Sequence, residues 1–186
     1  TVALRRIAQK MILRLSQKLA TKIKAGKLSE LPLDENPFAD WSCHIFTADR
    51  TQYIIVCNTA SMYSCVMYAR GIGNDNQFIQ LVLNLIREFT DDDGEAETYQ
   101  QHIAPASGSV RFAKALNRSV TGSINELVMT AGIYLTEHDM APHDVGFKLN
   151  NFRLSAIAGE DGDKYGKPKE AFRRLSLGAA FKRDEQ

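Results

Sequence analysis

The stretch between Trp41 and Ala69 constrains the fold more than any other part of the chain. Two runs rich in aromatic and β-branched residues, 41–48 and 52–58, are separated by Asp49-Arg50-Thr51, which predicts a β-hairpin. A third run, Tyr63–Ala69, follows after a short turn and predicts another strand. Because these strands succeed one another without an intervening helix, we expect no regular alternation of strand and helix.

The rest of the apolar pattern is mainly helical. Apolar residues spaced by three and four predict helices at 75–90 and 124–136, and Pro142 predicts a shorter helix at 142–150. Residues 110–116 predict one more short strand. Together these elements predict a single α+β domain at 11–158, with a mostly antiparallel sheet of about 4–5 strands and about three helices.

Charge is distributed unevenly along the chain. Residues 1–27 carry eight basic side chains and no acidic one, whereas residues 28–158 have a net charge of −8. The overall charge of +1 therefore hides a basic segment on an acidic body. We interpret 1–10 as an N-terminal extension, and 159–186 as a linker with a weakly ordered tail or short helix. Because lysine is rarely buried unpaired, we expect the basic side chains of residues 11–27 to point outward.

The basic segment has two structural interpretations that the sequence leaves open. A single amphipathic helix over 1–25 would align six apolar residues spaced by three or four, namely Leu4, Ile7, Met11, Leu15, Leu19 and Ile23. Alternatively, Met11–Leu15 is a short strand, and Ser16 caps a helix over 17–25 that ends before Gly26.

The expected core combines apolar residues from most of the predicted elements. We expect eight of them to belong to one core: Trp41, Ile45, Ile55, Val66, Phe78, Leu85, Leu127 and Leu135. Cys43, Cys57 and Cys65 lie on the predicted strands without a C-x-x-C motif, which predicts buried free thiols and a cytoplasmic location. No uncharged apolar run approaches the roughly 18 residues of a membrane span, so we expect no membrane partner.

Four segments of the chain resemble one protein family. They are 11–19, Trp41–Ser64, Leu149–Ile157 and the block Asn117-Arg118-Ser119-Val120-Thr121-Gly122-Ser123-Ile124-Asn125-Glu126. Together they resemble a family of small bacterial proteins that share a domain of unknown function. The resemblance implies no activity. It does imply that residues 1–10 and approximately 160–186 lie outside the shared domain.

The strongest candidate site is an anion site at the start of the helix predicted at 124–136. Ser123 precedes Glu126 by three residues, a capping-box spacing, so we expect Ser123 to cap a helix that begins at Ile124. A helix N-terminus offers N–H groups and a positive dipole to an anion. The candidate anion-binding residues are Arg111, Lys114, Asn117, Arg118, Ser119, Gly122, Ser123 and Asn125. The competing interpretation is that Ser123 and Glu126 only cap the helix and that the basic residues are solvated.

Other residue groups give weaker predictions. Five secondary candidates are Asp49, Arg50, Lys18, Lys22 and Lys24. Asp49 and Arg50 fit a hairpin turn better than a binding site at the edge of a sheet cleft. The pairs His138-Asp139 and His143-Asp144 have the chemistry of metal ligands, but His138 follows a predicted helix end, where a basic ring is favourable without a metal, so we expect neither a metal nor a cofactor.

These observations favour a non-enzymatic binding or regulatory module that recognises an anionic partner, namely nucleic acid, a nucleotide or a protein. The alternative is a small phosphoryl-handling hydrolase or nuclease that would use Asp49, Arg50 or the His–Asp pairs. The sequence holds no complete set of catalytic residues and leaves the oligomeric state open.

Overall fold

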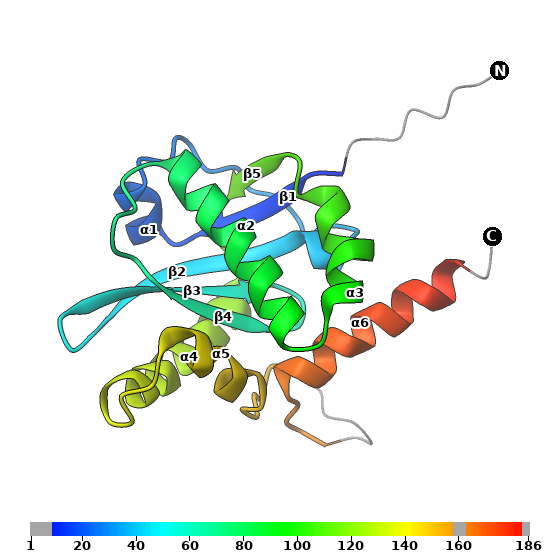
Figure 1. The fold of residues 1–186 in the computed structure, drawn as a ribbon. Helices are drawn as coiled ribbons and strands as arrows, with labels where there is room; N and C mark the ends of the chain where they lie inside the picture. The colour runs from blue at the N-terminus through cyan, green and yellow to red at the C-terminus, as the bar shows by residue number, and fades with distance from the viewer. Residues whose placement is uncertain (1–8, 158–162, 184–186) are drawn as a thin grey trace.

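The computed structural model describes residues 9–157 and 163–183, and a five-stranded sheet lies at its centre (Figure 1). In spatial order the strands are β4 (Ser64–Tyr68), β3 (Thr51–Asn58), β2 (Asp40–Ala48), β1 (Met11–Leu15) and β5 (Val110–Ala113). The pairs β2–β3 and β3–β4 are antiparallel, whereas β1 runs parallel to both β2 and β5. The predicted α+β fold and strand number are confirmed, and the two parallel pairs make the sheet mixed.

The β2–β3 hairpin forms where the sequence predicts it. Asp49 and Arg50 connect the strands with φ angles of 43° and 64°. Positive φ at both central residues is what a type I′ turn requires, and the twist of such a turn matches that of the paired strands. Asp49 and Arg50 therefore have a structural role in this turn.

The N-terminal part adopts the strand-and-helix alternative. All five side chains of β1 are buried, which suits a strand inside a sheet that is covered on both faces. The Ser16 hydroxyl accepts a hydrogen bond from the Leu19 N–H (3.3 Å) and caps α1 (Gln17–Lys22). A single helix over 1–25 is therefore wrong for the described part of this segment. Residues 1–8 of the expected N-terminal extension lie outside the described residues.

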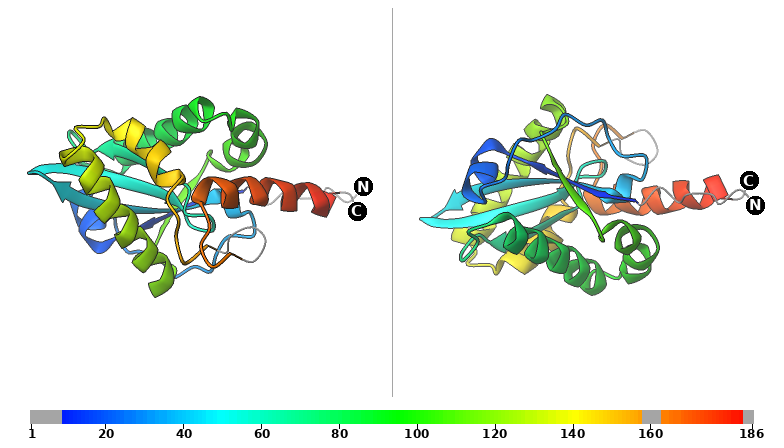
Figure 2. Two further views of the ribbon diagram at one scale, coloured as in Figure 1. Left: turned by 90° about the horizontal axis from the view of Figure 1, so that it is seen from below. Right: turned by 90° about the horizontal axis from the view of Figure 1, so that it is seen from above.

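Helices cover both faces of the sheet (Figures 1 and 2). On one face, which we call the α2 face, lie α1 and α2 (Asp75–Asp92); on the other, the α4 face, lie α4 (Arg118–Thr136) and α5 (Pro142–Asn150). Short helical segments complete the connections: η1 (Pro37–Ala39), α3 (Ala96–Thr98), η2 (Tyr99–Ile103) and η3 (Ala104–Ala106). The described chain thus has more helical segments than the three we expected.

The predicted single core is two cores, one on each face of the sheet. The cluster on the α2 face contains Trp41, Ile45, Phe78 and the half-buried Leu85. The cluster on the α4 face contains Ile55, Val66, Leu127 and Leu135. Successive residues of a strand point to opposite faces, and Ile45 pairs in register with Ile54 rather than Ile55. The sheet itself therefore separates residues that the prediction placed together.

Helix α4 begins at Arg118, six residues earlier than the predicted start at Ile124. Its N-cap is Asn117, whose Oδ1 accepts a hydrogen bond from the Val120 N–H (3.0 Å). Ser123 lies buried inside the helix, and its hydroxyl donates to the Ser119 carbonyl (3.0 Å). The predicted Ser123 cap is wrong because Asn117 is an equally good cap further upstream, and starting there adds backbone hydrogen bonds to the helix.

The C-terminal part contributes to the core. We expected a linker at 159–170 and then a weakly ordered tail or short helix; the structure has the helix α6 (Pro168–Arg183), which packs against the domain. Its Phe172 is fully buried against three aromatic rings, those of Phe38, Trp41 and Tyr63. Lys169 and Arg173 form ion pairs with Asp93 (2.6 Å) and Glu95 (2.7 Å). Residue 158 of the expected domain, residues 159–162 of the expected linker and residues 184–186 of the expected tail lie outside the described residues. Among the described helices, none combines the length and apolarity that crossing a bilayer requires.

Candidate functional site

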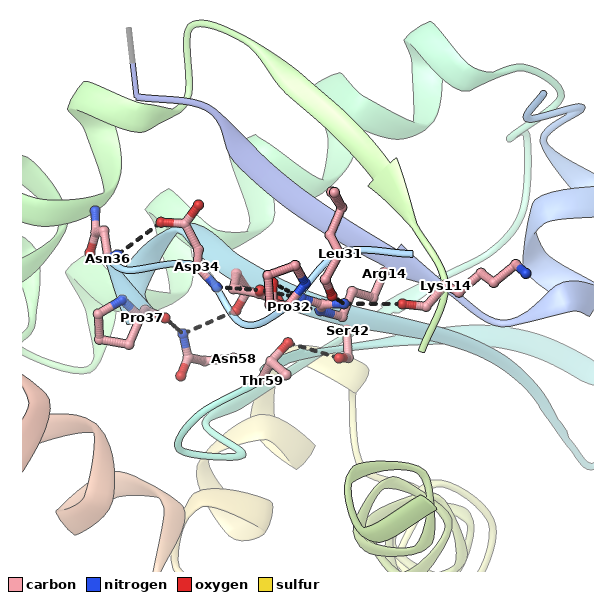
Figure 3. Close-up of polar contacts among 11 residues, drawn as sticks. Arg14, Leu31, Pro32, Asp34, Asn36, Pro37, Ser42, Asn58, Thr59 and Lys114 are labelled. Carbon is pink, nitrogen blue, oxygen red and sulfur yellow. Dashed lines mark hydrogen bonds and ion pairs between the residues drawn. The ribbon is translucent and has the colours of Figure 1, made fainter. Parts of the chain in front are cut away.

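A buried ion pair lies on the α4 face of the sheet (Figure 3). Arg14 of β1 is 1% exposed, and its guanidinium donates to both carboxylate oxygens of Asp40, at 2.8 Å from Nε and 2.7 Å from Nη2. Its other N–H groups donate to three backbone carbonyls, those of Leu31, Pro32 and Lys114. The expectation that the basic side chains of residues 11–27 point outward is wrong for Arg14, because Asp40 supplies the partner that a buried charge needs.

The loop between α1 and β2 covers this ion pair. The Asp34 N–H donates to Asp40 Oδ2 (3.1 Å), and the Asn58 side-chain amide donates to the Pro37 carbonyl (2.8 Å). Across the described residues, every buried side-chain nitrogen and oxygen has a hydrogen-bond partner. The polar cluster is therefore complete without a ligand, and its role is to fasten the loop to the sheet.

The same cluster positions Lys114, just after β5. Its carbonyl accepts a hydrogen bond from Arg14 Nη1 (3.3 Å), and its N–H donates to the Ser29 carbonyl (2.9 Å). With the backbone held in this way, the Lys114 side chain points away from the cluster (Figure 3). It forms a 3.1 Å ion pair with Glu30, and both side chains are largely exposed. An exposed pair contributes little to stability, so an external anion can replace Glu30.

Lys114 lines a groove beside α1, which we call the α1 groove. Its volume is about 310 Å³, and its lining residues are Gln17, Ala20, Thr21, Ala25, Gly26, Lys27, Leu28 and Lys114. Small and apolar residues account for half of this lining. The Thr21 hydroxyl donates to the Gln17 carbonyl (3.0 Å), so the donors that remain are the ammonium groups of Lys27 and Lys114 and the amide of Gln17. Such hydrogen-bond donors around a small-residue surface suit a phosphate or a carboxylate.

The other basic residues of the segment extend positive charge along α1. Lys18 and Lys24 are exposed, while Lys22 is half-buried and donates to Gln52 Oε1 of β3 (3.4 Å). Arg111 is exposed on β5, three residues before Lys114. Lys18 and Lys22 therefore lie on the helix that forms one side of the α1 groove, and Lys24 lies two residues beyond the end of that helix.

The eight predicted anion-binding residues do not converge on one site. Gly122, Ser123 and Asn125 lie inside α4, where the backbone N–H groups bond along the helix and are not available to an anion. The side chain of Asn117 is occupied by the helix cap. Arg118 and Ser119 are exposed in the first turn of α4. Of the predicted set, Lys114 alone lines the α1 groove.

The cysteine and histidine side chains do not form a reactive site in the described part of the chain. Burial raises the pKa of the Cys43, Cys57 and Cys65 thiols, to about 12 for Cys57, so they stay protonated at neutral pH. His143 Nε2 lies 2.8 Å from Asp92 Oδ2. Over residues 9–157 and 163–183, no group of three or more His, Cys, Asp or Glu side chains is arranged to hold a metal ion.

Sequence reasoning missed two parts of this arrangement. It did not identify Asp40 as the partner of Arg14, although a lone arginine inside the apolar run Met11–Leu15 was the available signal. It also missed Gln17, Thr21 and Lys27 as groove residues. These residues lie near Lys114 only because β1 pairs with β5. No local sequence pattern predicts a pairing between such distant segments.

The fold and the groove can now be compared with known proteins. A family model described as a domain of unknown function (DUF6933) matches residues 12–171. A search of curated proteins finds no relative that matches the chain. The matched segment includes the Arg14–Asp40 pair and the α1 groove, and it extends beyond residue 158 into α6, further than the sequence resemblance implied. The chain therefore belongs to the family defined by this domain of unknown function.

Proposed function

We propose that this chain is a bacterial, cytosolic, non-enzymatic module that binds the phosphate backbone of a nucleic acid through the α1 groove. The observation that carries the proposal is the meeting of Lys27 and Lys114, from distant parts of the sequence, at a single groove with a further donor on Gln17. The three free, buried thiols support a reducing compartment such as the cytosol.

The distribution of charge supports the choice of this groove. Residues 28–158 carry a net charge of −8, which repels a polyanion from most of the body. Three exposed basic residues extend the positive surface beyond the groove, namely Lys18 on α1, Lys24 just after α1, and Arg111 on β5. Lysine contacts to phosphates carry no sequence information, so we expect binding that is independent of nucleotide sequence.

Fluorescence anisotropy with a labelled oligonucleotide tests this proposal. If the surface engages about five phosphates, the affinity should fall several-hundredfold between about 50 and 200 mM salt. The double substitution Lys27→Gln and Lys114→Gln should weaken binding and reduce the slope of the salt dependence by about two. The matched control is Lys148→Gln with Lys164→Gln, which removes two exposed lysines that do not line the α1 groove.

Three results would contradict the proposal. Absence of binding at low salt would remove nucleic acid as the partner. An equal loss of affinity in the control variant would show that the α1 groove has no special role. Shortening of the oligonucleotide during incubation, if it persisted in the purified protein and disappeared with Asp49→Asn, would favour the alternative of a phosphoryl-handling hydrolase or nuclease.

A further inference from the structure

The outward-facing side of α4 has no partner within the described chain. In the view from below, α4 crosses the front of the molecule and no other element covers it (Figure 2, left). Met129 is 74% exposed and Ile133 is 48% exposed, although the helix has already buried Leu127 and Ala131 on its opposite side. Isolated exposed apolar residues are ordinary, but these two are one turn apart on the same stripe.

Glycines interrupt the same helix where the domain does not need them. Gly122 and Gly132 lie inside α4, and a Cβ atom at either position would meet nothing within 4 Å. Glycine weakens a helix relative to almost every other residue, and neither position has a positive φ that would require it. Within the monomer, neither close packing nor backbone conformation accounts for them. A second backbone that approaches α4 closely would account for Gly122, which lies on the same stripe as Met129 and Ile133.

The charges at the two ends of α4 indicate which partner fits. Arg118 stands in the first turn, and Glu137 is the C-cap. If the α4 helices of two copies run antiparallel, Arg118 of each copy faces Glu137 of the other. In the same register, Ile133 of each copy lies over Gly122 of the other, and the two Met129 side chains lie near the centre. A parallel arrangement would instead place like charges together.

We propose that a second copy of this chain docks on the outer face of α4, so that two antiparallel α4 helices form a symmetric dimer. The 19 residues of α4 span about 28 Å. One pair of helices of this length gives a contact at the small end of the range for specific interfaces, so we expect reversible self-association rather than an obligate dimer. The interface is independent of the proposed nucleic-acid binding, because the α1 groove borders α1, on the other face of the sheet.

Sedimentation velocity from about 5 to 500 µM protein tests the proposal. The unaltered chain should shift from monomer to dimer over this range. Gly122→Leu should raise the dimer dissociation constant about tenfold or more, because the new side chain occupies the place of Ile133 from the other copy. The monomer should keep or increase its melting temperature, since leucine is the better helix former. The matched control is Gly178→Leu in α6, another exposed helical glycine with nothing within 4 Å.

A charge exchange tests the orientation of the two helices. Arg118→Glu alone and Glu137→Arg alone should each weaken the dimer about tenfold, because each places like charges together twice. The double variant should return the dissociation constant to within about threefold of the original value, because the opposite charges are restored. A chain that stays monomeric throughout overturns the proposal. A dimer that is insensitive to Gly122→Leu, or a double variant that is weaker than both single variants, overturns it equally.

Discussion

The α4 face of the sheet is covered in two different ways over its two halves. Beneath α4 and α5, the cover is apolar, with Ile55, Val66, Leu127 and their neighbours in one cluster. Beneath the loop that precedes β2, the cover is polar, with Arg14 bonded to Asp40 and to three backbone carbonyls. The apolar half needs only shape and volume, so many side chains satisfy it. The polar half needs a hydrogen-bond partner for each N–H and each carboxylate oxygen. These hydrogen bonds hold the backbone of the loop at specific positions.

Among the substitutions that compare the two halves, Arg14→Met should have the largest effect on stability. It leaves Asp40 buried without its partner and should reduce the free energy of unfolding by about 3–5 kcal/mol. Urea unfolding followed by the fluorescence of Trp41, the single tryptophan, measures this change. The double variant Arg14→Met with Asp40→Leu should recover only part of the loss, because no unpaired charge remains but the backbone carbonyls that Arg14 served lose their donor. A loss below about 1 kcal/mol in the single variant would mean that the polar half is no more demanding than the apolar half.

A second prediction compares tolerance to conservative change. Leu127 is fully buried, so Leu127→Ala should cost about 2–5 kcal/mol, whereas Leu127→Met should cost less than about 1.5 kcal/mol. Arg14→Lys should cost more than Leu127→Met, because an ammonium group cannot reproduce the five forked donors of a guanidinium. The same urea titrations provide these values. The comparison fails if the lysine variant is as stable as the methionine variant.

The smallest expected effect on stability is at the N-terminus of α4. Asn117→Ala should cost about 1 kcal/mol, because the Val120 N–H loses its acceptor. Ser123→Ala should cost less, since its hydroxyl bonds only a carbonyl one turn back and alanine is the better helix former. Thermal unfolding of the two variants under identical conditions gives the order. If Ser123→Ala were the more damaging change, Ser123 and not Asn117 would be the energetically important residue at this helix start.

The parts of the fold that the sequence predicts well are those with local causes. The hairpin turn at Asp49 and Arg50 follows from the types of residue on either side of it. The strand Met11–Leu15 with its Ser16 cap was one of two open interpretations, and only burial on both faces of the sheet decides between them. The cap of α4 failed as a prediction because Asn117 and Ser123 both satisfy the local rule, and the choice between them depends on the total length of helix gained.

The candidate site was less predictable, and for a different reason. Lys114 was chosen because it stands near a helix start, yet its place in the α1 groove comes from hydrogen bonds to Arg14 and Ser29. Lys27 carried no local signal beyond its charge. The two lysines meet because β1 lies between β2 and β5, and strand order across a sheet is a property of the whole chain.

That strand order also has a consequence for how the protein folds. The hairpins β2–β3 and β3–β4 join neighbours in sequence, so little chain entropy opposes their formation. The contact between Arg14 and the Lys114 carbonyl spans 100 residues and belongs to the slowest class of native contacts to form. The β5 edge should therefore complete its pairing late in folding. A nascent or partly folded chain would then form most of its sheet before it forms the α1 groove. Any ligand of the groove would therefore bind only molecules that have finished folding.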